Sequence, residues 1–315
     1  MLVLLHTFLF ASPVVDIYRD GGIDAVEKYI KEQLQTKEYW KESLKNNDVS
    51  YGYYENLNSL LIANKKMKKL TVYSTKNSKL ELLSIYDNVI VGASGDKKKE
   101  GDLKTPLGVY NITQRFTPPD QFYGPLAFVL SYPNIYDKVQ GKNGHGIWIH
   151  GSPLDGSQRK PTSKGCIVLD NDTIELLDKN VKSKNSITIV SENGMQKTKK
   201  EQISTILAEL FRWKNAWKYS DIDTYLSFYS SDFKRYDGLR KKNFSRMKKS
   251  IFSRKQKKEI VFKNINIAPY PNEEGKALFK VAFYEIYKSR NYKFRGNKEL
   301  YVELNNKSFK ILSEK

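Results

Sequence analysis

The stretch from His150 to Leu169 reads H-G-S-P-L-D-G-S-Q-R-K-P-T-S-K-G-C-I-V-L and contains the only cysteine of the 315-residue chain, Cys166. The chain has three histidines, and one of them, His150, follows the apolar run Ile147–Ile149. A lone cysteine near a histidine is a candidate pair of nucleophile and general base. On these residues alone, a buried structural cysteine beside a core histidine stays open as the alternative.

The residues around this pair suit an acyl-transfer site. Regular strand alternation places Trp148 and His150 on one face of the segment. Gly151 follows directly, so a backbone carbonyl is available next to the imidazole. The Gly165–Cys166 step offers backbone N–H groups without a bulky neighbour, as an oxyanion hole requires.

The chemistry that this pair predicts is acyl transfer through a thioester. An ordinary thiol, with a pKa near about 8.5, is mostly protonated at neutral pH. We expect a nearby imidazolium to favour the thiolate and then to protonate the leaving amine. A zinc site needs three or four ligands, which one cysteine and so few histidines do not supply. We therefore expect no metal site and no cofactor.

The N-terminal residues indicate export. Met1–Ser12 is apolar and too short to span a bilayer as a helix. It matches the apolar region of a secretory signal, without the usual positive region before it. We interpret residues 1–15 as a signal-peptide remnant and expect a periplasmic protein. An unpaired thiol is a liability in an oxidising compartment unless it is buried or used, which favours a functional Cys166.

Residues 16–65 are predicted to be helical. Apolar side chains recur at helical spacing after the Gly21–Gly22 break and again further on. They are Ile23, Val26, Ile30, Leu34, Leu57, Leu60 and Leu61. This region is too small to bury a core alone, so we expect it to pack on the next domain or on a second copy of the chain, as a homodimer.

Two further domains follow. Residues 66–194 show short strands separated by Gly, Pro and Asn, beginning with a hairpin at Lys76–Ser78, and predict a mainly β domain. After a polar linker, residues 197–315 show helices followed by strands, which indicates a small α+β domain. The expected elements are helices near 203–217 and 225–229 and strands at 259–267, 277–287, 298–304 and 308–312.

Charge is distributed unevenly between these domains. The net charge of the whole chain is +19. Residues 1–195 carry 25 basic and 22 acidic side chains, whereas residues 196–315 carry 29 basic and 13 acidic side chains. A basic module suggests an anionic partner, such as an acidic cell-wall polymer, although a merely solvated lysine-rich face is the alternative. Export and the lack of a nucleic-acid motif count against nucleic acid. The basic runs are Lys241–Lys242, Lys248–Lys249 and Arg254–Lys258.

Several motifs, in order, resemble the L,D-transpeptidase (YkuD-type) catalytic domain. They are Gly101–Tyr110, Gly124–Tyr132, Gly146–Gly151 and Ser163–Ile167. The resemblance covers about residues 68–192 and implies a β-sandwich domain. It implies Cys166 as the nucleophile, His150 as the general base, the Gly151 carbonyl as the group that orients the imidazole, and an oxyanion hole at Gly165 and Cys166. The implied substrate is the peptidoglycan stem peptide, attacked at the L-centre of its diamino acid with expulsion of D-alanine.

Two positions depart from the family pattern. Lys164 stands where many members have His, and Val168 stands where many have Arg or Asn. Loss of the second polar group puts the handling of an acceptor strand in doubt. Lys164 is a candidate partner for a substrate carboxylate, with a solvated loop lysine as the alternative. The other substrate-binding candidates are Trp148, Ser163, Tyr123 and Arg115.

The C-terminal domain resembles a second family. Phe211–Trp217 and Asp223–Phe233 are similar to the opening helices of NTF2-like domains, and the four later strands fit the curved sheet of that fold. The whole order of domains resembles the cell-shape L,D-carboxypeptidases of helical epsilonproteobacteria, which trim tetrapeptide stems to tripeptides. The resemblance implies peptidoglycan stem peptides and glycan as partners, with the C-terminal domain holding wall polymer or a wall-associated partner.

Three functions follow as alternatives. A hydrolase and an L,D-transpeptidase share one acyl-enzyme and differ only in the acceptor, which is water for the first and the amine of another stem, giving a 3–3 cross-link, for the second. The domain order favours the carboxypeptidase. A non-catalytic wall-binding scaffold is the alternative from another class, and the intact set of Cys166, His150 and Gly151 counts against it.

Overall fold

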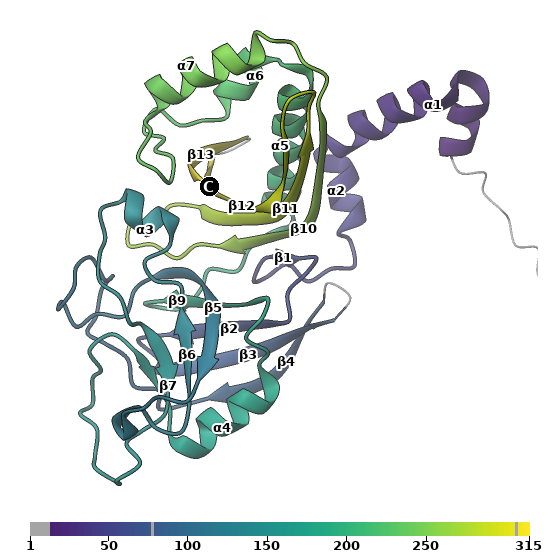
Figure 1. Ribbon diagram of the computed structural model, residues 1–315. Helices are drawn as coiled ribbons and strands as arrows, with labels where there is room; N and C mark the ends of the chain where they lie inside the picture. Colours follow the sequence, from purple (N-terminus) through teal and green to yellow (C-terminus); the bar gives the residue numbers. More distant parts are fainter. Residues whose placement is uncertain (1–12, 77–78, 306–307) are drawn as a thin grey trace, which may run out of the picture.

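The computed structural model describes residues 13–76, 79–305 and 308–315 (Figure 1). Most of the predicted signal segment and residues 77–78 of the predicted hairpin turn lie outside this part of the chain. Within it, a helical N-terminal segment precedes a β-rich central domain and an α+β C-terminal domain, which confirms the predicted fold class. No helix in the described residues is both long and apolar enough to cross a membrane.

Two helices form the N-terminal segment, α1 (Pro13–Leu34) and α2 (Lys37–Ser43). The N-terminal end of helix α1 extends away from the rest of the molecule (Figure 1), whereas its C-terminal half lies along α5, where Glu27 pairs with Lys218. The helix is kinked at Gly22, where φ is 68°. Residues with a side chain rarely adopt that conformation, so the break expected from the two glycines is confirmed. Helix α2 packs on the C-terminal domain, where Trp40 stacks on Phe211 with 5.5 Å between ring centroids.

The central domain is built on an eight-stranded sheet with the order β4-β3-β2-β9-β5-β6-β7-β8. The β2–β9 and β7–β8 pairs are parallel, and the other neighbours are antiparallel. The strands are β2 (Ser59–Asn64), β3 (Lys69–Lys76), β4 (Lys79–Tyr86), β5 (Gly108–Phe116), β6 (Ala127–Leu130), β7 (Trp148–His150), β8 (Ile167–Val168) and β9 (Ser186–Ser191). The helices are the 3-10 turn η1 (Gln121–Tyr123), α3 (Ile135–Val139) and α4 (Asn171–Asn180).

The predicted helical run around Leu57, Leu60 and Leu61 is wrong. Leu60 and Leu61 lie in β2, between β3 and β9, and both are fully buried. A strand that is buried on both faces carries an unbroken apolar run, and such a run has no period of two that separates it from a buried helix. The strand lies inside the range 16–65 that the sequence assigned to helices.

The C-terminal domain consists of a five-stranded antiparallel sheet, β1-β10-β11-β12-β13, and three helices. Its predicted first helix and four late strands are confirmed, whereas α7 was not predicted, because its lysine-rich sequence buries only Phe244 and Phe252. The strands are β1 (Tyr53–Tyr54), β10 (Glu259–Pro269), β11 (Leu278–Lys288), β12 (Lys293–Asn305) and β13 (Ser308–Glu314). The helices are α5 (Lys200–Tyr219), α6 (Ile222–Ser227) and α7 (Lys241–Phe252).

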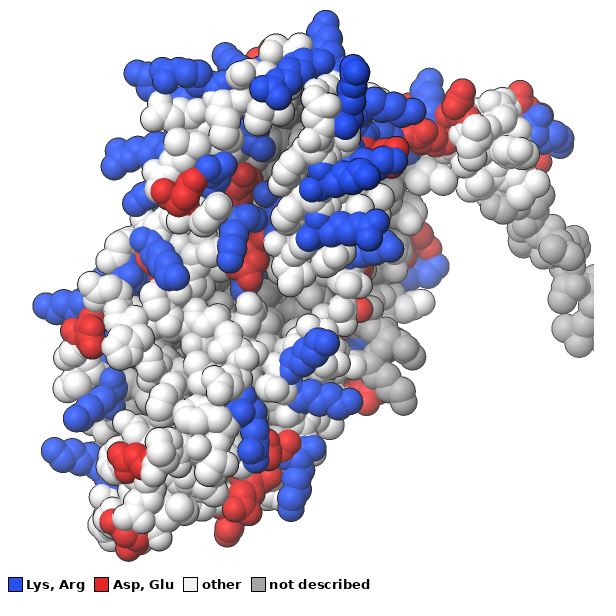
Figure 2. All heavy atoms as spheres, viewed as in Figure 1, with Lys and Arg blue, Asp and Glu red and all other residues white. Residues whose placement is uncertain are grey.

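Basic side chains crowd the C-terminal domain on the face that Figure 2 shows, but two lysines of the predicted basic runs point inward. Lys248 Nζ lies 5.2 Å from the centroid of the Trp217 ring, and burial lowers the pKa of its ammonium group to about 8. Lys258 is buried and donates a hydrogen bond to the carbonyl of Trp217 at 2.9 Å. These two lysines line the interior of the domain, because aromatic rings and the carbonyl groups at the end of α5 accept an ammonium group there.

The central and C-terminal domains share a hydrophobic core. Val109 of β5 pairs with Ile189 of β9, and both side chains pack on Leu278 and neighbouring residues of the C-terminal sheet. The next residues along these strands, Tyr110 and Val190, face the core of the central domain instead. Strands β5 and β9 are therefore covered by protein on both faces.

Candidate active site

Two parallel strands bring the predicted nucleophile and base together. Strands β7 and β8 pair Ile149 with Ile167 and His150 with Val168. Cys166, one residue before β8, therefore lies level with Trp148. Since alternate residues of a strand share a face, Trp148, His150 and Cys166 present their side chains on the same side of the sheet.

The imidazole of His150 is held by the next residue. Its Nδ1 lies 2.7 Å from the carbonyl oxygen of Gly151, so Nδ1 carries the proton and Nε2 keeps the lone pair that a general base needs. The side chain is 1 % exposed, and this burial lowers the pKa of the imidazole to about 4. A Cβ at position 151 would lie 2.5 Å from Oδ1 of Asn171, which accepts the N–H of Ser152, so only glycine fits there.

The thiol of Cys166 is half-buried. Its Sγ donates a weak hydrogen bond to the carbonyl of Gly146 at 3.4 Å. Burial raises the pKa of the thiol above its ordinary value, and the backbone N–H of Trp148 and the positive charges of Arg159 and Lys97 oppose that rise. Gly165 precedes the cysteine with φ at 127°, and a Cβ there would meet the carbonyl oxygen of Lys104 at 2.9 Å.

The two pKa shifts correct the expected charge state of the pair. Burial lowers the pKa of His150 and raises the pKa of Cys166, so both shifts favour the neutral forms. The expectation of a resting imidazolium and thiolate came from the sequence, which does not reveal burial. A neutral imidazole is the form that accepts a proton, so His150 suits removal of the thiol proton during attack on a bound carbonyl.

We expect iodoacetamide to alkylate Cys166 at pH 7 more slowly than it alkylates free cysteine, because the raised thiol pKa leaves less thiolate. The labelling rate, followed by intact mass, should rise with a midpoint above about pH 8.5, the ordinary thiol value. Cys166→Ala is the control and should take up no label, since the chain has no other cysteine. A rate that is already saturated below pH 8 would show a resting thiolate instead.

The backbone around the nucleophile departs from the predicted oxyanion hole. The N–H of Gly165 donates to Oγ of Ser163 at 3.1 Å, and that hydroxyl donates to the carbonyl of Cys166 at 2.6 Å. Ser163, which was a substrate-binding candidate, is buried and braces the turn that carries the thiol. Of the predicted pair of amides, only that of Cys166 meets no acceptor in the described part of the chain.

Aromatic rings form one wall of the site. Trp148 contacts Phe116 and Tyr123 edge-on, with ring centroids 5.1 and 5.0 Å apart. Tyr123 also contacts the imidazole of His150, at 5.0 Å. The structure thus places two predicted substrate-binding residues, Trp148 and Tyr123, beside the base. Their half-exposed rings offer an apolar surface for a substrate chain.

Two other candidates lie differently. Arg115 is engaged by Asp178 of α4 through two hydrogen bonds, of 3.0 and 2.7 Å, on the exposed surface, so it is not brought to the site. Lys164 is exposed beside the cysteine, where its ammonium group is free to meet a substrate. The remaining described histidine, His145, is 83 % exposed and faces Glu100 at 3.6 Å.

Arg159 is a site residue that the sequence reasoning missed. Its guanidinium stacks over the ring of Phe122 at 4.1 Å, and Nη2 donates to the carbonyl of the same residue at 2.7 Å. Its Nε is buried and has no partner among the described residues, and its charge acts on both Cys166 and His150. The one sequence signal was its position in the loop between base and nucleophile, which Lys160 shares.

Fold and site together define the class of this protein, a YkuD-type domain with a cysteine and a histidine on one sheet face, joined to an NTF2-like domain. Family models match in the same places. The L,D-transpeptidase catalytic domain (YkuD) matches residues 58–190, and the Cds6 C-terminal NTF2-like domain matches residues 205–315. The first match begins at β2, in agreement with the corrected start of the sheet.

Solved structures extend the likeness over the whole chain. The helical cell shape determining protein Pgp2 from Campylobacter jejuni is 45 % identical, with a TM-score of 0.85 over 89 % of this chain and 99 % of that one. Bd1075 of Bdellovibrio bacteriovorus is 25 % identical, with a TM-score of 0.68 over 85 % and 96 %. The chain therefore belongs to the L,D-transpeptidase (YkuD) family, in the form that carries a C-terminal NTF2-like domain.

A curated relative matches the catalytic part alone. "Putative L,D-transpeptidase YafK" of Escherichia coli (strain K12) is 30 % identical over 112 residues. The match spans 35 % of this chain and 42 % of that protein, so the chain covers less than half the length of this relative.

Proposed function

We propose that this protein is a periplasmic peptidoglycan L,D-carboxypeptidase that removes the terminal D-alanine from tetrapeptide stems and leaves tripeptides. Membership of the L,D-transpeptidase family supports an enzyme that acts on peptidoglycan, and the likeness to a cell shape determining protein supports a role in shaping the wall. The observation that carries the proposal is the geometry of Cys166, His150 and Gly151. The choice of water as acceptor rests on the order of the domains.

The proposed reaction follows from the neutral pair. Nε2 of His150 takes the thiol proton while Sγ of Cys166 attacks the carbonyl carbon at the L-centre of the diamino acid. The N–H of Cys166 is the donor at hand for the oxyanion. The imidazolium then gives its proton to the amine of D-alanine, which leaves, and a thioester remains. Water, deprotonated by the imidazole, cleaves the thioester to give the tripeptide carboxylate and the free thiol.

Arg159 is the proposed partner of the substrate's terminal carboxylate. A guanidinium binds a carboxylate through two parallel hydrogen bonds. Nη2 of Arg159 is already bonded to Phe122, whereas Nε is buried and has no partner among the described residues. A carboxylate placed there completes the hydrogen bonding of the side chain and sets the D-alanine next to Cys166.

We expect Arg159→Ala to raise KM for a tetrapeptide stem by about 10- to 100-fold, because a hydrogen bond to a charged group is lost, with a smaller effect on kcat. Steady-state kinetics on a stem ending in D-alanine amide supply the contrast, since wild type and variant should process this uncharged end equally. Arg115→Ala, which removes an exposed arginine bound to Asp178, is the matched control and should keep the wild-type KM. An unchanged KM in Arg159→Ala would remove Arg159 from the substrate site.

The product of the wild-type protein tests the proposal as a whole. Incubation with disaccharide-tetrapeptide muropeptides should give species lighter by one alanine residue, identified by mass spectrometry. Dimers joined through two diamino acids would establish the transpeptidase alternative instead. Unchanged substrate would favour the scaffold.

The C-terminal domain is proposed to hold a wall-associated ligand in its own cavity of about 530 Å³. Lys248 and Lys298 line this cavity together with the carboxylates of Glu285 and Glu314, under the ring of Trp217. Charges of both signs beside an aromatic ring suit a polar ligand with an apolar face. Helix α1, whose Ile23 and Ile30 are exposed, is the proposed contact with a second copy of the chain.

A further inference from the structure

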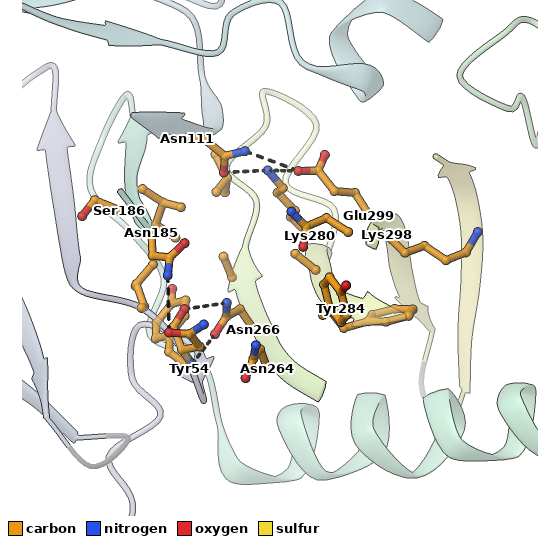
Figure 3. A pocket seen from close by; sticks show the side chains of 18 of the residues that line it. Tyr54, Asn111, Asn185, Ser186, Asn264, Asn266, Lys280, Tyr284, Lys298 and Glu299 are labelled. Carbon is orange, nitrogen blue, oxygen red and sulfur yellow. Dashed lines mark hydrogen bonds and ion pairs between the residues drawn. The ribbon is translucent and has the colours of Figure 1, made fainter. Parts of the chain in front are cut away.

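A cleft of about 240 Å³ lies where the sheets of the two domains meet (Figure 3). Strands β5 and β9 of the central domain line one side, and β10, β11 and β12 line the other. None of the described active-site residues lines it, so it is separate from the site of Cys166. Ligand cavities usually span about 300–1,000 Å³, so this cleft takes one ring of an extended chain rather than a bulky molecule.

Ala282 forms the floor of the cleft, and the residues that flank it on the neighbouring strands are larger. Ala282 of β11 lies directly across from Asn266 of β10 and Glu299 of β12. Two residues along the same face, Tyr284 lies across from Asn297. Because paired residues point to the same side of a sheet, the methyl group of Ala282 leaves a hollow beside the half-buried ring of Tyr284.

One end of the cleft is a fixed and neutral polar cluster. Nζ of Lys280 lies 2.9 Å from Oε1 of Glu299 and donates to Oδ1 of Asn111 at 3.2 Å, while Nδ2 of Asn111 donates to Glu299 at 3.4 Å. The Lys280 side chain is 4 % exposed, and this pairing holds the pKa of Glu299 below its ordinary value. The two charges cancel each other, so this end offers hydrogen bonds without a net charge.

The other end consists of asparagine side chains. Asn56 and Asn266 bond each other through backbone and side chain, at 3.2 and 3.1 Å, and Nδ2 of Asn185 donates to Asn56 at 3.5 Å. Asn264 sits in a bulge of β10 with φ at 57°, a conformation that asparagine tolerates. Asn264 and Asn297 are exposed at the rim of the cleft, and their amides make no hydrogen bond with other described residues.

This lining selects one kind of ligand. The cleft is lined by many amide donors and acceptors and by the aromatic ring of Tyr284. The charges of Lys280 and Glu299 neutralise each other. The side chain of Lys298 extends away from the cleft (Figure 3) and lies 3.9 Å from Glu314. An anion finds no free positive charge here, and a lipid chain would leave the amides without partners. A sugar ring fits, because its hydroxyl and acetamido groups bond amides while its C–H face packs on a tyrosine ring.

We propose that this interdomain cleft binds a neutral N-acetylated glycan chain, which on the function proposed above is the glycan strand that carries the stem peptides. One sugar lies in the hollow over Ala282 against Tyr284, with Asn264 and Asn297 bonded to its polar groups. The protein thereby holds the strand at one site and trims its peptides at another.

The test is binding of chitotetraose, the β-1,4 tetramer of N-acetylglucosamine, to the full-length Cys166→Ala protein, measured by calorimetry. We expect saturable binding that Tyr284→Ala and Asn297→Ala each weaken by about tenfold in Kd, which corresponds to about 1.4 kcal/mol. Ala282→Phe, which fills the hollow without removing a polar group, should abolish binding. Tyr219→Ala, an exposed tyrosine at the end of α5, should bind like the parent, and thermal melting shows that each variant is folded.

Two results would overturn the inference. One is the absence of chitotetraose binding to the folded parent protein. The other is equal binding by the parent, Tyr284→Ala and Ala282→Phe, which would move the glycan to another surface. Trimming of a glycan-free tetrapeptide by the wild-type protein is a separate readout of the proposed function. Trimming without glycan binding refutes the glycan cleft alone, and glycan binding without trimming refutes the carboxypeptidase alone.

Discussion

Replacing Cys166 with alanine is expected to lower tripeptide formation by at least about 10⁴-fold, because no other group in the site can form the acyl-enzyme. The thiol contributes little to the fold, since the hydrogen bond that it donates to the carbonyl of Gly146 is weak, at 3.4 Å. The free energy of unfolding should therefore change by less than about 1 kcal/mol. Turnover of tetrapeptide muropeptides and urea unfolding, measured on the same sample, separate the two effects.

Cys166→Ser is the matched variant. Its hydroxyl keeps the hydrogen bond to Gly146 and the size of the side chain but is a poorer nucleophile than a thiol with a histidine base, so it should be nearly as inactive as Cys166→Ala. Wild-type turnover by Cys166→Ala would remove the cysteine from the mechanism. Turnover lost only together with the fold would leave the cysteine as a structural residue.

Replacing His150 with glutamine is expected to lower kcat by about 10²- to 10⁴-fold, the usual contribution of a general base. Glutamine can still donate a hydrogen bond to the carbonyl of Gly151, so the loss reports proton transfer rather than packing. Residual activity of the variant should rise with pH until the thiol ionises by itself, above about pH 8.5. His145→Gln, at an exposed position beside Glu100, is the control and should keep full activity.

The wild-type pH profile follows from the same group. His150 acts as a base only when it is neutral, and burial lowers its pKa to about 4. Activity should therefore rise as the pH increases through about 4 and be level near 6.5, where an ordinary histidine would still be titrating. A profile of kcat/KM with its acidic limb at 6.5 would contradict a buried neutral imidazole.

The sequence was sufficient for the parts of the site that lie close together in the chain. With one cysteine and three histidines there were few pairs to choose from, and strand alternation placed Trp148 and His150 on one face. The role of Ser163 was different from the expected one because its hydroxyl turns back to the peptide of Gly165, a local bond that its residue type does not reveal. Arg159 was missed because only the fold shows that its Nε is enclosed.

Features that depend on contacts between residues far apart in the chain could not be predicted from the sequence. Strand β2 has an apolar sequence that fits a buried helix equally well, and it becomes a central strand by pairing with β3 on one side and with β9, more than 120 residues away, on the other. From its sequence context Lys248 is one more surface lysine in a basic run, and only the folded domain shows that its ammonium group lies over the ring of Trp217. The interdomain cleft combines asparagines such as Asn56 and Asn266, which no local pattern connects.

Strands β5 and β9 determine whether the catalytic domain can be separated from the NTF2-like domain. One face of each strand belongs to the core of the catalytic domain and the other to the core shared with the NTF2-like domain, through Val109 and Ile189. Deleting the C-terminal domain would expose an apolar sheet face to water, at the very strands that lead towards the catalytic residues. The NTF2-like domain thus covers one face of the sheet of the catalytic domain, and we expect the catalytic domain alone to be less stable than the whole chain.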